Sequence, residues 1–229
     1  MQHIAIIMDG NRRWARNNRL QAVFMGHEKG VEPVKKSVAW CLEHKVAYLS
    51  LYAFSLENMH RSEEEKAALF SLLTRALEQE TENLVSKGVA VHFIGDRTLM
   101  PDQVLDQINA IEKATVMGKA LVVQVMFFYG GQQELVYAAK SLAQKVKEGS
   151  LALDAITTET MKDALWTAGV PDPDMVIRAG GHVRLSNFLL FQSAYSEWFF
   201  LDTLWPDFNE EHLNQCAEKF NHLKRNFGQ

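Results

Sequence analysis

Residues 1–15, MQHIAIIMDGNRRWA, decide the fold of this chain. Within them, residues 4–8 form an uninterrupted apolar run, which is typical of a strand buried on both faces of a sheet. The run ends in Asp9-Gly10-Asn11, three residues that favour a turn and leave backbone N–H groups available. Arginines follow at once, where a helix could begin, at positions 12, 13 and 16.

A carboxylate at the end of a buried strand, a glycine turn and adjacent arginines favour a diphosphate site with a divalent cation. The backbone amides and the planar guanidinium groups would bind phosphate oxygens, and Asp9 would hold the metal. An ordinary strand-to-helix turn with solvated arginines explains the same residues. This stretch alone leaves both interpretations open.

The rest of the chain alternates between strand and helix patterns. Apolar runs predict further strands at residues 46–54, 89–95, 121–129, 175–177 and 199–201. Helical periodicity predicts helices at residues 28–45, 62–86, 101–117, 132–147, 158–168 and 210–226. Ser62 and Glu65 are spaced as a capping box at the start of the longest helix, which Gly88 would close. The alternation predicts a single α/β domain over residues 1–229, with a mostly parallel central sheet flanked by helices.

Composition narrows the class of protein. The 229 residues are 47% hydrophobic and carry a net charge of −4, so the molecule as a whole is not a nucleic-acid binder. Cys41 and Cys216 lie far apart within helix patterns and are expected to be reduced core residues of a cytoplasmic protein. No charged and apolar leader and no apolar run of about 18 residues is seen, so neither a signal peptide nor a membrane span is expected.

Polar side chains follow the predicted strands, at residues 9–13, 55–61, 96–97, 130–131 and 178–186. Because the carboxyl ends of parallel strands share one edge of a sheet, we expect these loops to converge. They bring five arginines suited to planar recognition of phosphate, namely Arg12, Arg13, Arg61, Arg178 and Arg184. Arg97, in contrast, is expected to form an ordinary surface ion pair.

Several reaction types have no motif here. The chain lacks GxxxxGK[ST], HExxH, paired CxxC and G-x-S-x-G, and no GxGxxG follows the first strand. Ser55 and Ser186 have no evident histidine partner, so the chemistry is expected to be electrophilic, with a metal and arginines stabilising a departing diphosphate. His27 and His182, each beside a glycine in a site loop, are candidates for phosphate contact or proton transfer.

Seven segments together are specific: HIAIIMDGNRRWA, Gly26-His27, LYAFSLENMHR, FIGD, YGG, VIRAGG with VRLSNFLL, and AYSEWFF with LWPDF. In this order, over nearly the whole chain, they resemble the cis-prenyltransferase family, typified by undecaprenyl diphosphate synthase. The resemblance implies a homodimer with a hydrophobic tunnel beneath the sheet edge. It also implies Mg²⁺-dependent extension of an allylic diphosphate, usually farnesyl diphosphate, by isopentenyl diphosphate to a Z-polyprenyl lipid carrier.

The resemblance also assigns roles to residues. Asp9 would engage Mg²⁺ and diphosphate, with Glu197 as the second carboxylate at the metal. The allylic diphosphate would be bound by Gly10, Asn11, Arg12, Arg13, Trp14 and His27. The half of the site that binds isopentenyl diphosphate would include Arg178, His182, Arg184, Leu185 and Ser186. The mobile loop would include Ser55, Leu56, Glu57, Asn58, Met59 and Arg61. Asn58 stands where the family often places the proton acceptor, but a neutral amide is a poor base, so we expect it to orient the substrate.

The chain departs from the family pattern at six positions: Val23, Met59, Ser62, Phe128, Gln132 and His182. These changes affect the expectation that the product is undecaprenyl diphosphate more than the expectation of prenyl transfer itself. Two alternatives therefore stay open: a short-chain or irregular synthase of the same fold, and a weakly catalytic subunit of a heteromeric enzyme. A phosphate-binding module without chemistry is a third, less favoured alternative, and peripheral contact with the inner face of a membrane is left open.

Overall fold

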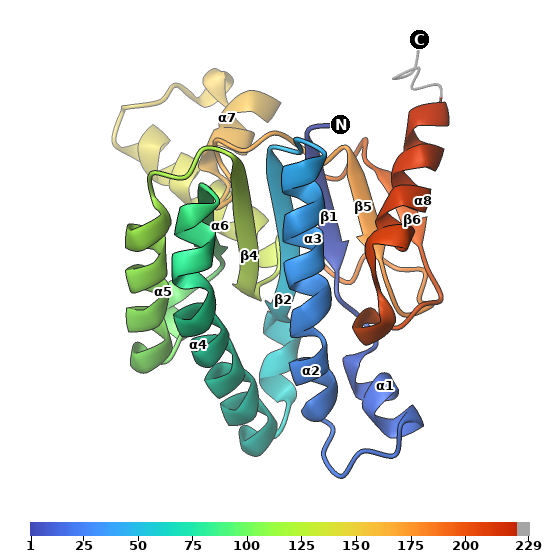
Figure 1. Cartoon of the computed structure of the whole chain (residues 1–229). Helices are drawn as coiled ribbons and strands as arrows, with labels where there is room; N and C mark the ends of the chain where they lie inside the picture. Colours follow the sequence, from blue (N-terminus) through green and yellow to red (C-terminus); the bar gives the residue numbers. More distant parts are fainter. Residues whose placement is uncertain (224–229) are drawn as a thin grey trace.

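The structure, a computed structural model, is described for residues 1–223 and is built on one six-stranded parallel sheet (Figure 1). The strands, in the spatial order β3-β4-β2-β1-β5-β6, are β1 (His3–Ile7), β2 (Tyr48–Ser55), β3 (Val89–Ile94), β4 (Leu121–Tyr129), β5 (Met175–Arg178) and β6 (Glu197–Phe200). All five pairings are parallel, which confirms the fold class predicted from the sequence. The leading strand lies inside the sheet, between β2 and β5.

Helices cover both faces of this sheet. They are α1 (Asn11–Asn17), α2 (Met25–Lys29), α3 (Val31–Glu43), α4 (Glu63–Ser86), α5 (Asp102–Thr115), α6 (Gly131–Lys147), α7 (Thr158–Ala164) and α8 (Glu210–His222), with short 3₁₀ turns including η1 (Leu56–His60) and η4 (Trp205–Asp207). In Figure 1, α3, α4 and α5 lie in front of the sheet, α6 and α7 lie behind it, and α1 and α2 lie beyond the tips of the strand arrows. Among the described helices, none combines the length and apolarity needed to cross a bilayer.

Strand β1 is buried on both faces, as its uninterrupted apolar run predicts. Ile4 and Ile6 belong to the core beneath α3, α5 and α8, whereas Ala5 and Ile7 belong to a second core on the opposite face. The alternation follows from the two-residue period of side chains along a strand. Cys41 and Cys216 are also buried and free, as expected.

The structure differs from the sequence prediction in one helix that matters for the site. The helix predicted over residues 28–45 is divided at Gly30 into α2 and α3. The indole Nε1 of Trp205 donates a hydrogen bond of 2.8 Å to the carbonyl oxygen of Gly30. A side chain at position 30 would also meet the Asn11 side chain, with Cβ 2.5 Å from its Oδ1. The helix is thus divided by contacts with residues distant in sequence, which the local apolar periodicity does not reveal.

Other differences are at helix ends. The helix predicted to reach residue 117 ends at Thr115, and the one predicted to reach residue 168 ends at Ala164. The terminal helix is described to His222, and the predicted residues 224–226 lie outside the described part of the chain. Helix ends depend on tertiary contacts and commonly shift by a turn.

Candidate active site

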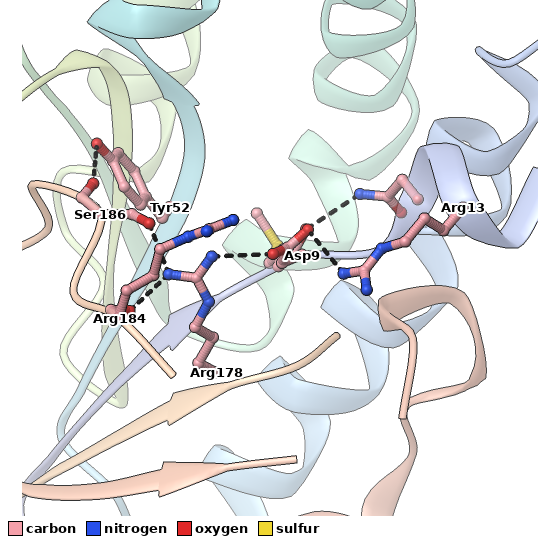
Figure 2. Close-up of polar contacts among 8 residues, drawn as sticks. Asp9, Arg13, Tyr52, Arg178, Arg184 and Ser186 are labelled. Atoms are coloured by element: carbon pink, nitrogen blue, oxygen red, sulfur yellow. Dashed lines mark hydrogen bonds and ion pairs between the residues drawn. The ribbon is translucent and has the colours of Figure 1, made fainter. Parts of the chain in front are cut away.

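The predicted convergence of loops occurs at the carboxyl ends of the three central strands. In the sheet register, Ile7 at the end of β1 pairs with Tyr52 of β2 on one side and with Arg178 of β5 on the other. Asp9, two residues beyond β1, therefore lies beside the end of β5 (Figure 2). The loop after β2 forms η1 at the same edge.

Asp9, Arg13, Arg178 and Ser186 form what we call the Asp9 cluster (Figure 2). Arg178, only 3% exposed, donates from Nη2 to Asp9 Oδ2 at 2.9 Å. Its Nη1 donates to Ser186 Oγ and to the backbone carbonyl of Arg184, both at 2.6 Å. The other Asp9 oxygen lies 3.4 Å from Nη2 of Arg13. Three acceptors therefore fix one buried guanidinium, and its Nε remains buried without a hydrogen-bond partner.

Two glycines allow this close approach. Gly10 has a φ of 113° and Gly180 a φ of 93°, conformations that side-chain-bearing residues rarely adopt. A Cβ on Gly180 would lie 2.7 Å from Nη2 of Arg13 and 2.9 Å from the backbone oxygen of Asp9. The turn after β5 thus packs against the turn after β1 only because position 180 lacks a side chain.

A second group, which we call the Glu65 cluster, lies at the start of α4. The Glu65 carboxylate accepts a hydrogen bond from Arg61 at 3.0 Å and lies 3.6 Å from Arg12 and 3.9 Å from His27 Nε2. Burial, together with the positive charges of Arg61 and Arg12, lowers the pKa of His27 to about 4, so the imidazole is neutral near pH 7. Its Nε2 is buried without a hydrogen-bond partner.

The Glu65 cluster also corrects the predicted capping box. Ser62 accepts a hydrogen bond from the Glu65 backbone N–H at 3.3 Å, as predicted. The reciprocal contact, from the Glu65 side chain to the start of the helix, is not part of the observed cap. The carboxylate instead contacts Arg61 and Arg12, since charge attraction competes with capping.

In the loop after β2, Asn58 is oriented by its neighbours. The Ser55 backbone N–H donates to Asn58 Oδ1 at 3.1 Å, and the Ser55 side chain accepts from the Asn58 backbone. The amide oxygen is therefore in use, and the amide NH₂ is left to donate. This geometry suits an orienting role and not proton abstraction. Leu56 and Met59 in the same loop pack against the main core.

A cavity of about 890 Å³ opens from this edge and runs between the sheet and α4. Its walls are mainly apolar and include Val34, Leu51, Leu69, Leu73, Leu77, Val91, Ile111 and Phe127. The leucines of α4 are only partly buried, and Lys66 is the one residue of this helix that is fully buried. Because the apolar stripe of α4 lines this cavity as well as packing against the core, the cavity matches the expected hydrophobic tunnel.

The cavity mouth gathers most of the predicted site residues. They are Asp9, Gly10, Asn11, Arg12, Arg13, His27, Ser55, Glu57, Asn58, Arg61, Arg178 and Ser186. Seven other predicted residues do not line the cavity: Trp14, Leu56, Met59, His182, Arg184, Leu185 and Glu197. The indole of Trp14 donates instead to Asp207 at 2.8 Å, and Arg184 contributes its backbone carbonyl to Arg178.

Glu197 lies apart from Asp9 within this chain. It is the first residue of β6 and pairs with Met175, whereas Arg178 pairs with Phe200 at the other end of the same two strands. Three residues of strand separate the two positions, roughly 10 Å at the usual rise. Within this chain Glu197 therefore lies toward the opposite ends of the strands from Asp9, and its assignment as the second carboxylate at the metal stays a prediction.

The sequence prediction missed three residues at or beside the mouth: Tyr52 and Asn187, which line the cavity, and Glu65, which holds arginines that line it. Tyr52 donates to the Ser186 carbonyl at 3.3 Å and to the Tyr129 carbonyl at 3.4 Å, and the Glu65 carboxylate holds two arginines. Asn187 lines the cavity beside Ser186. Its position directly after Ser186, in a polar loop following a strand, was the available signal.

The Asp9 cluster is suited to a metal ion that a diphosphate shares. Across residues 1–223, no group of three histidine, cysteine, aspartate or glutamate side chains forms a protein-only metal site. Mg²⁺ commonly uses one or two carboxylates together with phosphate oxygens and water. Asp9, partly exposed and surrounded by guanidinium groups, fits such a ligand set.

Fold and site together define a class of protein: a parallel α/β protein with an anion-binding edge that opens into an apolar cavity. Such a site accommodates a molecule with a charged phosphate head and a hydrocarbon chain.

Comparisons with known proteins identify the family. The family model for undecaprenyl diphosphate synthase (Prenyltransf) matches residues 7–228. The farnesyl-diphosphate-specific ditrans,polycis-undecaprenyl-diphosphate synthase of Pasteurella multocida is 41% identical over 99% of this chain and 94% of that protein. The isoprenyl transferase of Heliobacterium mobile is 43% identical over 99% of this chain and 87% of its own length. The chain belongs to this prenyltransferase family.

Solved structures agree. Lavandulyl diphosphate synthase from Lavandula x intermedia, in complex with dimethylallyl diphosphate, superposes with a TM-score of 0.96 at 32% identity, over 100% of this chain and 98% of that one. A probable undecaprenyl diphosphate synthase from Campylobacter jejuni gives a TM-score of 0.82 at 32% identity, over 100% and 99%. The resemblance stated from the sequence motifs is thereby confirmed.

Proposed function

We propose that this enzyme condenses isopentenyl diphosphate with an allylic diphosphate, farnesyl diphosphate, in a Mg²⁺-dependent reaction that yields a Z-polyprenyl diphosphate of the undecaprenyl type. The observation that carries the proposal is the Asp9 cluster at the mouth of the apolar cavity. The cluster offers charge complementary to diphosphate, and the cavity offers space for the growing chain. Relatives named as farnesyl-diphosphate-specific synthases support the choice of primer.

Each group at the mouth has a task in this reaction. Arg12, Arg13 and His27 bind the allylic diphosphate, and Arg178 with Ser186 binds isopentenyl diphosphate. The allylic C–O bond breaks, the double bond of isopentenyl diphosphate attacks the allylic carbon, and one proton is lost from the new chain. Magnesium held by Asp9 would neutralise charge on the leaving diphosphate. The guanidinium groups stabilise the same charge and are already oriented for it.

A second product class has support of its own. The structure superposes closely on lavandulyl diphosphate synthase, and Phe127 lines the cavity within a group of packed aromatic rings that includes Phe54, Phe70 and Phe128. Bulky rings at this wall favour shorter products. We therefore retain a short-chain or irregular synthase as the alternative.

Incubation with labelled isopentenyl diphosphate, Mg²⁺ and either farnesyl or dimethylallyl diphosphate, followed by resolution of the products, tests the proposal. A ladder of long Z-polyprenyl products supports the main proposal, and a single C10 product supports the alternative. No turnover with either primer would indicate a subunit of a heteromeric enzyme and would refute the proposal. Chelation of the metal with EDTA is expected to stop the reaction, and added Mg²⁺ to restore it.

Three further proposals complete this function. The whole chain, residues 1–229, acts as one cis-prenyltransferase domain. It works in the cytoplasm as a homodimer, an expectation supported by the family resemblance. Release of a long apolar product brings the enzyme into peripheral contact with the membrane, because the tail leaves the cavity for another apolar environment.

A further inference from the structure

Asn187 connects two loops of the site that are distant in sequence. Its Nδ2 donates to Glu57 Oε1 at 2.9 Å, in the loop that also carries Asn58. It directly follows Ser186, which accepts a hydrogen bond of 2.6 Å from Arg178. One side chain therefore lies between the Arg178 half of the site and the loop of residues 55–61.

The orientation of the Asn187 amide follows from its partners. The backbone N–H of Gln132 can only donate, and it donates to Asn187 Oδ1 at 2.8 Å. The amide NH₂ consequently faces Glu57 and the side-chain oxygen of Gln133, which accepts at 3.1 Å. Since the Glu57 carboxylate accepts and does not donate when ionised, donor and acceptor match at this contact.

The backbone at this position is specialised. Asn187 has a φ of 61°, and Ser186 and Leu189 also have positive φ, at 51° and 43°. Asparagine tolerates this left-handed region better than most side chains, and clusters of such residues are typical of functional loops. The carbonyl of Asn187 also accepts from the Gly131 N–H at 2.7 Å, so the start of α6 anchors the residue.

Gly130 makes room for this arrangement. A Cβ at position 130 would lie 2.8 Å from Nδ2 of Asn187 and closer still to the side chain of Gln133. The start of α6 therefore leaves space for the amide that reaches Glu57.

The hydrogen bond also affects Glu57 itself. Burial raises the pKa of this carboxyl, but hydrogen bonds from its own backbone N–H and from the Asn187 and Ser55 side chains outweigh burial and lower it overall. The contact with Asn187 is thus one of the hydrogen bonds that favour the ionised, accepting form of Glu57.

We propose that Asn187 is a positioning residue that couples the isopentenyl diphosphate half of the site to the loop of residues 55–61 through Glu57. An anion bound at Arg178 and Ser186 fixes the adjacent Asn187, and the amide then fixes Glu57 and with it the position of Asn58. The inference rests on the proposed function and deepens it, because it links binding of the second substrate to the loop that orients it.

An exchange of donor and acceptor tests the coupling. Asn187→Asp keeps an oxygen for the Gln132 N–H but sets a carboxylate against Glu57, and we expect kcat to fall by roughly tenfold or more, as for a lost hydrogen bond to a charged group. Adding Glu57→Gln supplies a donor facing that carboxylate and should recover several-fold of the loss. Gln133→Ala, the matched control, removes the other acceptor of the amide and should stay within about twofold of wild type.

Two results would overturn the coupling: additive losses in the double variant, or an equal loss in Gln133→Ala. If Asn187→Asp does not fold, Asn187→Gly, which accepts the left-handed backbone, replaces it and should show no recovery with Glu57→Gln.

A measurement without turnover separates this inference from the proposed function. Hydrogen exchange in residues 55–61 should slow when inorganic pyrophosphate is added to the wild type and should not respond in Asn187→Gly. An equal response in both proteins would refute the coupling even in an active enzyme. Absence of product in the wild type would refute the proposed function and leave the exchange result to decide the coupling.

Discussion

Replacement of Asp9 by alanine separates the chemistry of the site from the stability of the fold. The change removes the acceptor of the buried Arg178 guanidinium at 2.9 Å and that of Arg13 at 3.4 Å. Removing one partner of a fully buried ion pair costs about 3–5 kcal/mol, and an exposed pair contributes about 0–1 kcal/mol. Because Asp9 is 28% exposed and Arg178 only 3%, we expect a loss of about 2–3 kcal/mol in the free energy of unfolding.

For a chain of this length, that loss lowers the unfolding temperature by about 4–12 °C, so the variant should still fold. Prenyl transfer, in contrast, should fall by about a thousandfold or more, because the variant lacks the carboxylate that we propose as the magnesium ligand. Product formation and thermal unfolding measured on the same preparation provide the test. Asp172→Ala, which removes a surface ion pair with Lys162, is the control and should leave both quantities nearly unchanged. Turnover of Asp9→Ala at the wild-type rate would refute the assignment of the site.

Three further predictions concern packing, pH and product length. Gly180→Ala should lower activity strongly, because its Cβ would come 2.7 Å from a guanidinium nitrogen of the Asp9 cluster. The control Gly149→Ala, with positive φ but no neighbour within 4 Å, should cost only about 1 kcal/mol of stability. Equal activity in the two variants would contradict this prediction. Burial lowers the pKa of His3 to about 4, so between pH 4 and 6.5 the unfolded chain binds more protons than the folded one. The free energy of unfolding should therefore decline as the pH falls through that range, by about 2–3 kcal/mol at its lower end. Urea unfolding at pH 7 and pH 4.5 tests this, and His3→Gln should flatten the pH dependence. Ala76→Phe, at the cavity wall, should shorten the products, whereas Ala67→Phe on the exposed side of α4 should not; identical product lengths would show that the chain grows elsewhere.

The sheet could be predicted because its strands carry strong local signals. The run at residues 4–8 is apolar without interruption, the run at residues 121–129 is interrupted only by Gln124, and both form interior strands. The location of the site could also be predicted, because the carboxyl ends of parallel strands all lie at one edge of the sheet. Arg97 was also placed correctly, as a surface ion pair at 2.6 Å from Glu112.

What could not be predicted depends on partners distant in sequence. The division of the helix at Gly30 involves the Trp205 indole, and the Glu65 carboxylate lies near Arg12 of a distant segment as well as the neighbouring Arg61. Glu197 was assigned by resemblance, although a residue that begins a parallel strand lies at the amino edge of the sheet, away from the loops that follow the other strands.

The half-covered leucines of α4 have a consequence for how long a lipid stays bound. Each methylene group that enters the hollow beside them gains about 0.8 kcal/mol by leaving water. A lengthening tail would then pack as a temporary part of the interior. Its affinity would rise with every addition until the tail is longer than the cavity can cover. Departure of the finished molecule, and not bond formation, would then limit the rate of the whole cycle.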